Sequence, residues 1–481
     1  MVRPDRAGLP RRLAIVLCLA ACRTAAPSGD VASPADQGKR PDEDAIRGLP
    51  GYRSELISAP VFGGEVFVME AGEASAPAVV LVHGLGESGC RDFYPVLPAL
   101  AARHHVVAFD LPGFGRSTHA SELYSPERYA EFIHALLGPR LHAPFNLVGH
   151  SMGGALSLYY AARFPAEVQR LLLIDAAGVL HRKAFVNFAV EAGLDNLLGA
   201  LAKPIKELAT VVSESTDTAL GPIVPGSPDP SVVLRNDRLR ATVLGSPMRI
   251  AALAVMLENF GPVLDAVRAP SFILWGSNDA IASPRTGLVL QARLPSAKLT
   301  VLEGSGHDPM ASRPAAVEQF LLAALAAPGP GPAPKVASPF PALPARKGRC
   351  EREQGMHFSG DYAEIELVGC QDVVLRDVRV AALRIRDSYA AIENTRVMAQ
   401  GTALEVKGSR VVITASDFVG NIAVDVEGSD LDLAGVVMRG QRAAVHVGGA
   451  AKLIFSVSRA DSPINHRYLH GVYEFDIGAE L

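Results

Sequence analysis

The chain has 481 residues, of which 49% are hydrophobic and 20% charged, and its formal net charge is −4 at pH 7. This length exceeds the usual size of one hydrophobic core and predicts more than one domain, while the near-balance of charge argues against nucleic acid as a partner. No apolar run reaches the roughly 18 residues that a transmembrane helix needs.

The first residues are typical of a secretory signal peptide. Four arginines precede an uninterrupted apolar run from Leu13 to Ala21, as in the basic and apolar regions of such a signal. The run ends Leu19-Ala20-Ala21-Cys22, and this ending resembles the lipobox of bacterial lipoproteins. The resemblance implies that residues 1–21 are cleaved off and that the Cys22 sulfur carries a diacylglycerol. A plain secretory signal with an incidental cysteine is the alternative.

A lipid on Cys22 would place the protein at a membrane of the bacterial cell envelope. Arg23 follows the cysteine, and in the enterobacterial sorting pattern a residue that is not acidic favours the outer membrane. The sequence leaves open which face of that membrane the protein occupies. Residues 22–48 are rich in Pro, Ala, Ser, Gly and charged residues, and this composition predicts a flexible tether.

Residues 49–327 alternate short apolar runs with helical stretches. The runs lack polar alternation, which is typical of buried parallel strands, and lie at 78–82, 106–109, 145–148, 168–174, 272–275 and 299–302. Helices are predicted at 126–137, 152–164 and 314–326. This alternation predicts an α/β sheet. The interval at about 178–268 breaks the rhythm, and its apolar, helix-like composition predicts a cap over the carboxyl edge of the sheet.

The strongest motif is Gly149-His150-Ser151-Met152-Gly153, which directly follows a predicted strand and opens a predicted helix. A Gly-x-Ser-x-Gly turn is so tight that side chains at its glycines would clash, and it exposes the serine oxygen at the edge of the sheet. We therefore predict that Ser151 is a nucleophile. The alternative is a surface serine in a glycine-rich turn.

A serine hydroxyl becomes a nucleophile when a base, held by an acid, takes its proton. The chain supplies both in the order Ser, Asp, His, since Asp279 follows the strand at 272–275 and His307 follows the next strand. We predict His307 as the general base and Asp279 as the acid that orients it. Asp175, at the end of an earlier strand, is the fallback acid.

The oxyanion hole is predicted to consist of two backbone N–H groups, those of Leu85 in the turn at 83–86 and of Met152. These motifs and the stretch at 109–117 resemble the α/β-hydrolase superfamily over residues 50–327. The carboxylesterases and the carbon–carbon bond hydrolases are the most similar members. Haloalkane dehalogenases and soluble epoxide hydrolases share the scaffold but use aspartate as the nucleophile, so the serine argues against both.

The resemblance implies an α/β-hydrolase fold with a helical cap and hydrolysis of a carboxylic ester through an acyl-enzyme on Ser151, with no cofactor and no metal. The apolar cap favours a small, hydrophobic ester as the substrate. A carbon–carbon bond hydrolase or an acyltransferase with the same triad is the alternative within catalysis. A surface binding lipoprotein that uses the fold only as a scaffold is the alternative outside it.

A Pro-rich stretch at 328–345 predicts a semi-rigid linker, and the pattern changes after it. In residues 346–481, aliphatic-x-aliphatic pairs recur at spacings of 18, 21, 20 and 21 residues, with first members Ile365, Leu383, Leu404, Val424 and Val445. A period of about 20 residues predicts stacked rungs. The region resembles a small all-β domain of the parallel β-helix type, and an irregular β-sandwich is the alternative.

Cys350 and Cys370 are predicted to form a disulfide at the start of this repeat. They are 20 residues apart, about one rung, and rungs stacked about 4.8 Å apart bring Cα atoms within the range that a disulfide accepts. No aliphatic pair precedes Cys350 in register, so it lies either on a full rung or on a cap strand. Two unpaired thiols are the alternative. The repeat shows no converging catalytic set and could bind a cell-envelope partner.

Overall fold

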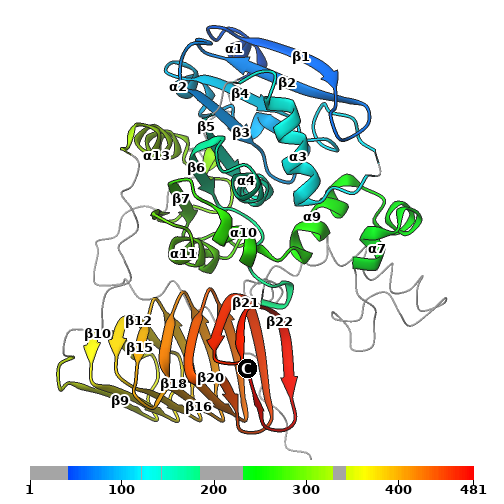
Figure 1. Cartoon of the computed structure of the whole chain (residues 1–481). Coiled ribbons are helices and arrows are strands. Elements are labelled where there is room, and N and C mark those ends of the chain that lie inside the picture. The colour runs from blue at the N-terminus through cyan, green and yellow to red at the C-terminus, as the bar shows by residue number, and fades with distance from the viewer. Residues whose placement is uncertain (1–41, 121, 142–143, 185–230, 329–342) are drawn as a thin grey trace, which may run out of the picture.

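The computed structural model describes residues 42–120, 122–141, 144–184, 231–328 and 343–481. Within these residues the chain forms an 8-stranded and a 15-stranded sheet (Figure 1). The predicted signal, Cys22, most of the predicted tether and linker, and the part of the predicted cap at 185–230 lie outside the described residues. No helix in the described ranges is both long and apolar enough to cross a membrane.

The first sheet has the strand order β1-β2-β4-β3-β5-β6-β7-β8. Its strands are β1 Arg53–Ser58, β2 Glu65–Ala71, β3 Ala78–Val82, β4 His105–Phe109, β5 Phe145–His150, β6 Val168–Ile174, β7 Ser271–Gly276 and β8 Ala297–Leu302. The six predicted strands are β3 to β8, and they pair in parallel. β1 and β2 are antiparallel additions at one edge.

Helices cover both faces of this sheet, so neighbouring residues of one strand enter different cores. Val80 and Leu147 face one cluster of buried side chains, whereas Val79 and Val148 face another. A strand buried on both faces has no position at which a polar residue would reach water. This explains the continuous apolar runs that identify the central strands in the sequence.

The predicted helices at 126–137 and 314–326 are α3 and α13, and the predicted helix at 152–164 is α4, which ends at Arg163. The helices of this part are α1 Glu43–Arg47, η2 Gly89–Phe93, α2 Leu97–Ala101, α3 Pro126–Leu137, α4 Met152–Arg163, α11 Pro284–Arg293, α12 Pro309–Ser312 and α13 Pro314–Ala326. Ser125 begins α3, because its side chain accepts a hydrogen bond from the Arg128 N–H.

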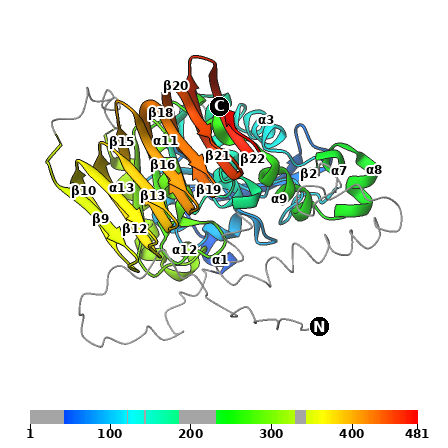
Figure 2. The ribbon, with the colours of Figure 1, turned by 90° about the horizontal axis from the view of Figure 1, so that it is seen from below.

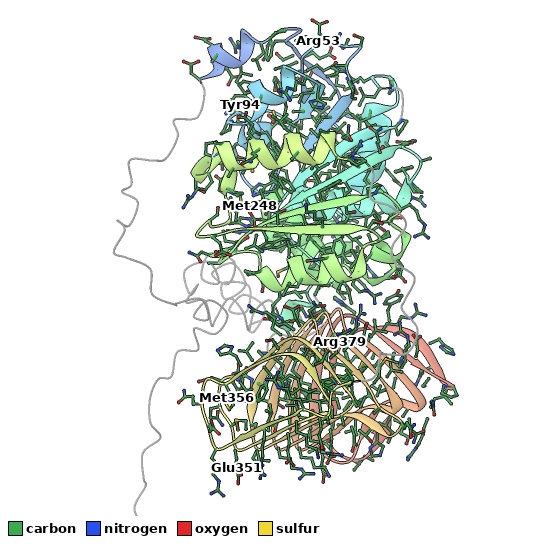
Figure 3. The ribbon with its side chains drawn as sticks, turned by 90° about the vertical axis from the view of Figure 1, so that its left-hand side faces the viewer. Arg53, Tyr94, Met248, Glu351, Met356 and Arg379 are labelled. Atoms are coloured by element: carbon green, nitrogen blue, oxygen red, sulfur yellow. A yellow bond between two sulfur atoms is a disulfide. The ribbon has the colours of Figure 1, made fainter. Side chains whose placement is uncertain are left out.

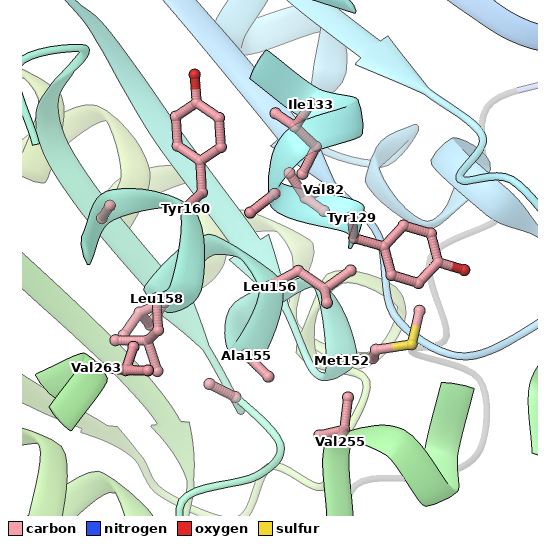
Figure 4. Packing of buried hydrophobic residues seen from close by; sticks show 14 of the residues in the cluster. Val82, Tyr129, Ile133, Met152, Ala155, Leu156, Leu158, Tyr160, Val255 and Val263 are labelled. Carbon is pink, nitrogen blue, oxygen red and sulfur yellow. The ribbon is translucent and has the colours of Figure 1, made fainter. Parts of the chain in front are cut away.

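The described part of the predicted cap is helical. Its elements are α7 Ser231–Arg235, α8 Asp237–Leu239, η3 Arg240–Leu244, α9 Pro247–Leu257 and α10 Phe260–Ala266. Val255 of α9 and Val263 of α10 belong to the same buried cluster as Met152 and Leu158 of α4 (Figure 4). These helices therefore pack on the helix that follows Ser151.

The second sheet is a solenoid of parallel strands stacked along three faces. Its strands are β9 Lys347–Glu351, β10 His357–Tyr362, β11 Glu364–Val368, β12 Val373–Val380, β13 Leu383–Arg386, β14 Tyr389–Glu393, β15 Arg396–Met398, β16 Thr402–Lys407, β17 Arg410–Thr414, β18 Asp417–Glu427, β19 Ser429–Ala434, β20 Val437–Val447, β21 Ala451–Ser462, β22 Asn465–Phe475 and β23 Ala479–Glu480. The prediction of a parallel, β-helix-like domain is confirmed.

The five predicted aliphatic pairs stack in register. The first members lie opposite one another in the pairs β11–β13, β13–β16, β16–β18 and β18–β20, and all of these first members are fully buried. β9 adds one more rung, because Cys350 lies opposite Leu367. The structure joins Cys350 to Cys370 in a disulfide with a Cα–Cα distance of 6.4 Å.

A ladder of serines lies beside the aliphatic pairs. The Ser388 N–H donates to Ser409 Oγ at 3.0 Å, and the Ser409 N–H donates to Ser429 Oγ at 3.0 Å. Each hydroxyl also donates to the carbonyl two residues earlier in its own rung. These serines therefore satisfy buried backbone groups between rungs.

The C-terminal end of the solenoid departs from the parallel pattern. β22 pairs with β21 and β23 pairs with β20, both antiparallel. The solenoid lies on the side of α10 and α11 in Figure 1, and in the view from below in Figure 2 its strands lie in front of α11 and α13. Figure 3 shows the two parts from another side, in direct contact.

Candidate active site

Ser151 is the single residue between strand β5 and helix α4. Its backbone adopts φ 53° and ψ −120°. A positive φ is a strained backbone conformation for a residue that has a side chain. Two hydrogen bonds hold this turn: the Ser151 N–H donates to the Ile174 carbonyl at 3.0 Å, and the Ala177 N–H donates to the Ser151 carbonyl at 2.9 Å. The segment that follows β6 therefore fixes the position of Ser151.

The two outer glycines of the motif are required by packing. A Cβ at Gly149 would overlap the Gly153 carbonyl, and a Cβ at Gly153 would overlap the Val82 carbonyl. The helix can start this close to the strands only because both side chains are absent. The sequence-based reason for these glycines, a turn too tight for side chains, therefore agrees with the structure.

The structure brings Ser151, His307 and Asp279 together from three different loops. His307 Nε2 lies 2.8 Å from Ser151 Oγ, and His307 Nδ1 lies 2.8 Å from Asp279 Oδ2. Asp279 and Ser151 are buried, with 3% and 6% of their surfaces exposed. When Nδ1–H donates to the carboxylate, the Nε2 lone pair faces the serine hydroxyl, which is the arrangement that allows proton transfer from Oγ.

The backbone holds the Asp279 carboxylate. Its Oδ1 accepts hydrogen bonds from the N–H groups of Ile281 at 2.8 Å and Ala282 at 2.9 Å. The carboxylate therefore cannot rotate away from His307 without losing both contacts. The loop after β7 thus determines the orientation of the imidazole.

The predicted oxyanion turn lies directly against Ser151. A Cβ at Gly84 would lie 2.9 Å from the Ser151 Cβ, so only glycine permits this approach. Within the described part of the chain, no protein group accepts a hydrogen bond from the Leu85 or the Met152 N–H. Both donors are therefore available to an oxygen bound beside Ser151.

His83 connects this turn to a neighbouring loop. Its Nδ1 lies 2.7 Å from the Gly84 carbonyl, and its Nε2 accepts a hydrogen bond from the Leu111 N–H at 2.8 Å. Burial lowers the pKa of His83 and favours the neutral ring. Since the peptide group is planar, fixing the Gly84 carbonyl also fixes the opposite direction of the Leu85 N–H.

Asp175, the fallback acid, lies behind the site. Its Oδ1 accepts a hydrogen bond from the Gly276 N–H at 2.8 Å, and the residue is completely buried. Burial, with the nearby Asp279 carboxylate, raises the pKa of Asp175 to about 9. The carboxylate hydrogen-bonded to His307 is that of Asp279, and the raised pKa of Asp175 favours its neutral form.

His150, next to the nucleophile, was not predicted to have a role. Its Nε2 lies 2.9 Å from the His307 carbonyl, and the two rings lie 5.3 Å apart. Burial and the neighbouring His307 lower the pKa of His150 to about 4. A neutral His150 with its proton on Nε2 therefore donates to the loop that carries His307.

Comparison with known protein families assigns the first part of the chain to a family of hydrolases. Residues 79–320 match the model of the alpha/beta hydrolase family. The chain belongs to this family. The match covers both residues predicted for the oxyanion hole and all three members of the hydrogen-bonded set, and it ends before the solenoid.

The relatives named here match between half and three fifths of this chain. An uncharacterized protein of Mycobacterium tuberculosis is 29% identical over 266 residues, which are 51% of this chain and 76% of that protein. Lipase 1 of Psychrobacter immobilis is 28% identical over 262 residues, or 53% and 79% of the two chains. A solved structure of a membrane phospholipase A, described as a bacterial virulence factor, has a TM-score of 0.44 and 26% identity, covering 59% of this chain and 90% of that chain.

The sequence motifs of the hydrolase identify the three residues that the structure joins by hydrogen bonds, but not the residues that support them. His83 and His150 each stand next to a motif residue, and their partners Leu111 and the His307 carbonyl come from distant loops. The Ser312 hydroxyl donates to the Asp308 carbonyl at 2.9 Å. Among the described residues, no group of three or more His, Cys, Asp or Glu side chains could hold a metal ion.

Proposed function

We propose that this hydrolase cleaves carboxylic esters through an acyl-enzyme on Ser151. The chain of hydrogen bonds from Ser151 Oγ through His307 to Asp279, at the carboxyl edge of the sheet, is the observation that carries the proposal. The similarity to a lipase, whose name describes an ester hydrolase, supports the same class of reaction. We assign Ser151 as nucleophile, His307 as base and Asp279 as the orienting acid.

In the first half of the reaction, Ser151 Oγ attacks the ester carbonyl carbon while its proton moves to His307 Nε2. The carbonyl oxygen becomes negative and accepts hydrogen bonds from the Leu85 and Met152 N–H groups. The tetrahedral intermediate then expels the alcohol, which takes the proton from His307. The acyl group remains on Ser151 Oγ as an ester.

In the second half, water attacks the acyl-enzyme and gives one proton to His307 Nε2. The same two N–H groups stabilise the second oxyanion. When the intermediate collapses, the proton returns to Ser151 Oγ and the carboxylic acid leaves. Each oxyanion donor of this kind is worth about 10²–10³ in turnover, because the donors already point at the position where charge develops.

An apolar ester is the substrate class that the surroundings of the site favour. The Leu85 side chain, beside the oxyanion turn, is 37% exposed, and Ile281, beside the orienting acid, is 40% exposed. An exposed apolar side chain loses water when it contacts an apolar acyl or alcohol group. We therefore expect turnover to improve from acetate to medium-chain esters.

The test is hydrolysis of p-nitrophenyl esters of increasing chain length by the wild-type protein and by Ser151→Ala. Because loss of the nucleophile removes the covalent step, we expect turnover to fall by at least about 10³. Ser312→Ala is the matched control, since among the described residues its hydroxyl donates a hydrogen bond to the Asp308 carbonyl and to no group of the triad, and it should retain full turnover. Retention of more than about a tenth of the activity by Ser151→Ala would contradict the proposal.

We also propose that the hydrolase is attached to a membrane of the bacterial cell envelope through a lipid on Cys22. The small-small-Cys ending of the apolar N-terminal run supports this. Cys22→Ser should move the protein from the membrane fraction to the soluble fraction. An unmodified mature N-terminus at another residue, found by mass spectrometry, would contradict it.

A further inference from the structure

The solenoid contacts the hydrolase at several places, and two of the contacted segments also hold the catalytic groups. We define the docking face of the solenoid by the residues that make these contacts: Ile413, Thr414, Asp432, Ala434, Ile454, Ser456, Val457, Tyr468 and His470. They come from β17, β19, β21 and β22, which lie beside α10 and α11 in Figure 1. The contacts combine ion pairs, hydrogen bonds and apolar packing.

The first contact is made by Arg285 at the start of α11. Its guanidinium donates to both Asp432 oxygens at 3.2 Å, to Thr414 Oγ1 at 2.9 Å and to the Ile413 carbonyl at 3.3 Å. The Arg285 and Asp432 side chains are only 14% and 12% exposed. A bidentate ion pair that is largely buried and has further hydrogen bonds fixes the direction of the guanidinium. It therefore holds Arg285 in place against the solenoid.

Arg285 lies three residues after Ala282, whose N–H holds the Asp279 carboxylate at 2.9 Å. The Trp275 Nε1–H donates to the Ala282 carbonyl at 3.1 Å. The short loop that carries the orienting acid is therefore fixed by β7 on one side and by the solenoid on the other. Movement of Arg285 would be transmitted to Asp279 through this loop.

The second contact involves the segment that follows β6. The His181 N–H donates to Ser456 Oγ at 2.8 Å, and the His181 ring lies edge-on to His470 at 5.1 Å. Four residues earlier, the Ala177 N–H donates to the Ser151 carbonyl. The solenoid therefore also holds the segment that supports the nucleophile turn.

Apolar packing joins the two parts between these contacts. Ala434, Ile454 and Val457 of the solenoid belong to the same buried cluster as the hydrolase core. Gly435 lies so close to α11 that a Cβ there would be 2.9 Å from Val289 Cγ1. Two parts that share one apolar cluster do not move independently without exposing it to water.

We infer that the solenoid is a positioning element for the hydrolase site, with Arg285 and Asp432 as its central pair. It holds the Asp279 loop through Arg285 and the nucleophile turn through His181, although no solenoid residue contacts the reacting atoms. This role rests on the proposed ester hydrolysis. Catalytic groups displaced by about 1 Å can lose about 10²-fold in rate, so rigid support of both loops has a measurable effect on turnover.

The test compares Arg285→Met with two controls in the full-length chain. Arg379→Met removes a bidentate pair with Asp361 inside the solenoid, and Arg379 is labelled in Figure 3. Ile385→Ala destabilises the solenoid core, where Ile385 is fully buried, without altering the docking face. The controls separate loss of the docking contact from loss of an ion pair or of stability.

Two measurements are made on each variant. Hydrogen exchange of peptides covering 276–284 reports the order of the Asp279 loop whether or not an ester is turned over. We expect faster exchange in Arg285→Met but not in the two controls. We also expect a kcat about tenfold lower and a KM within about twofold, because the substitution displaces the acid and removes no group that contacts the ester. Asp432→Asn, which removes only the charge, should lie between wild type and Arg285→Met, and Arg285→Lys should recover part of the loss.

Unchanged exchange and unchanged kcat in a folded Arg285→Met would overturn the inference. So would an equal loss of kcat in Ile385→Ala, because stability alone would then explain it. Failure of the proposed function has a different result: the wild-type protein would hydrolyse no ester, while the exchange of 276–284 would still decide whether the solenoid orders the loop.

Discussion

The hydrolase and the solenoid use serine in different ways. Ser151 occupies a strained turn beside two N–H groups that no described protein group accepts from, and its hydroxyl faces an imidazole. Ser409 occupies one step of a repeated ladder, where its hydroxyl accepts from the Ser388 N–H and donates to the Lys407 carbonyl. Beside Ser151, the N–H groups without a protein acceptor can bind an oxygen of a substrate. In the ladder, the Ser409 hydroxyl both accepts and donates a hydrogen bond, and this stabilises the fold.

The comparison predicts that substitutions at the hydrolase edge affect rate and that substitutions in the ladder affect stability. The largest effect should follow Asp279→Asn. An amide at this position no longer selects the Nδ1–H tautomer of His307, so we expect kcat to fall by about 10⁴. The measurement is steady-state hydrolysis of a p-nitrophenyl ester.

Asp175→Asn is the matched control for that experiment, because Asp175 is also buried at the same edge but has no hydrogen bond to His307. We expect it to stay within about tenfold of wild type in kcat. A larger loss in Asp175→Asn than in Asp279→Asn would move the role of orienting acid to Asp175.

The same aspartate should give the hydrolase a distinct dependence on pH. The pKa of Asp175 is raised to about 9 in the folded protein, whereas an unfolded Asp titrates near about 3.9. Between these values the folded state holds a proton that the unfolded state has lost, so the contribution of Asp175 to stability falls as pH rises, by up to about 1.4 kcal/mol per pH unit.

Asp175→Asn cannot ionise and should remove this decline. Urea unfolding at pH 6, 7 and 8 measures the free energy of unfolding of the variant and of the wild type. The value of the variant minus that of the wild type should increase as pH rises. A difference between variant and wild type that stays constant with pH would show that Asp175 is already ionised in the folded protein.

Removal of the disulfide should change the stability of the solenoid and leave the activity of the hydrolase unchanged. Cys350 and Cys370 close a loop of 20 residues, and on the chain-entropy estimate this closure stabilises the fold by about 3 kcal/mol. Cys370→Ser should lower the free energy of unfolding by about this amount and leave kcat unchanged, because the first rungs lie outside the docking face. The measurement is denaturant unfolding combined with ester hydrolysis below the transition. A fall in kcat of the folded variant would contradict the separation of the two effects.

The smallest effect should follow Ser409→Ala. The substitution leaves the buried Ser388 N–H without its acceptor, which costs about 1–3 kcal/mol, and thermal unfolding measures it. Ser429→Ala removes the same two hydrogen bonds one rung later, so the two variants should agree within about 1 kcal/mol. Costs that differ by much more would mean that the rungs are not equivalent.

Periodicity and local motifs explain why much of this structure could be predicted from the sequence. The strand at 78–82 is apolar throughout because both of its faces are buried, and the pair Ile365/Leu367 recurs because each rung stacks on the next. The nucleophile turn could be predicted because Gly149 and Gly153 are required by packing. In each case the signal lies within a few residues or at a fixed spacing.

Features that depend on distant partners could not be predicted. β1, Arg53–Ser58, is mostly exposed and has neither an apolar run nor clear alternation. The rung at β9 has Gly348 where later rungs have an aliphatic residue, so its register with Ile365 is invisible in the pattern. The roles of Arg285 and His181 could not be predicted, because their partners Asp432 and Ser456 are distant in the sequence.

Active-site labelling decides whether Ser151 is a nucleophile activated by His307. A fluorophosphonate probe reacts with a serine whose proton is removed by a neighbouring base. The proposed mechanism predicts rapid labelling of the wild-type protein, with the adduct mapped by mass spectrometry to Ser151 and no labelling of His307→Ala. An adduct on another residue, or no adduct on folded wild-type protein, would contradict it.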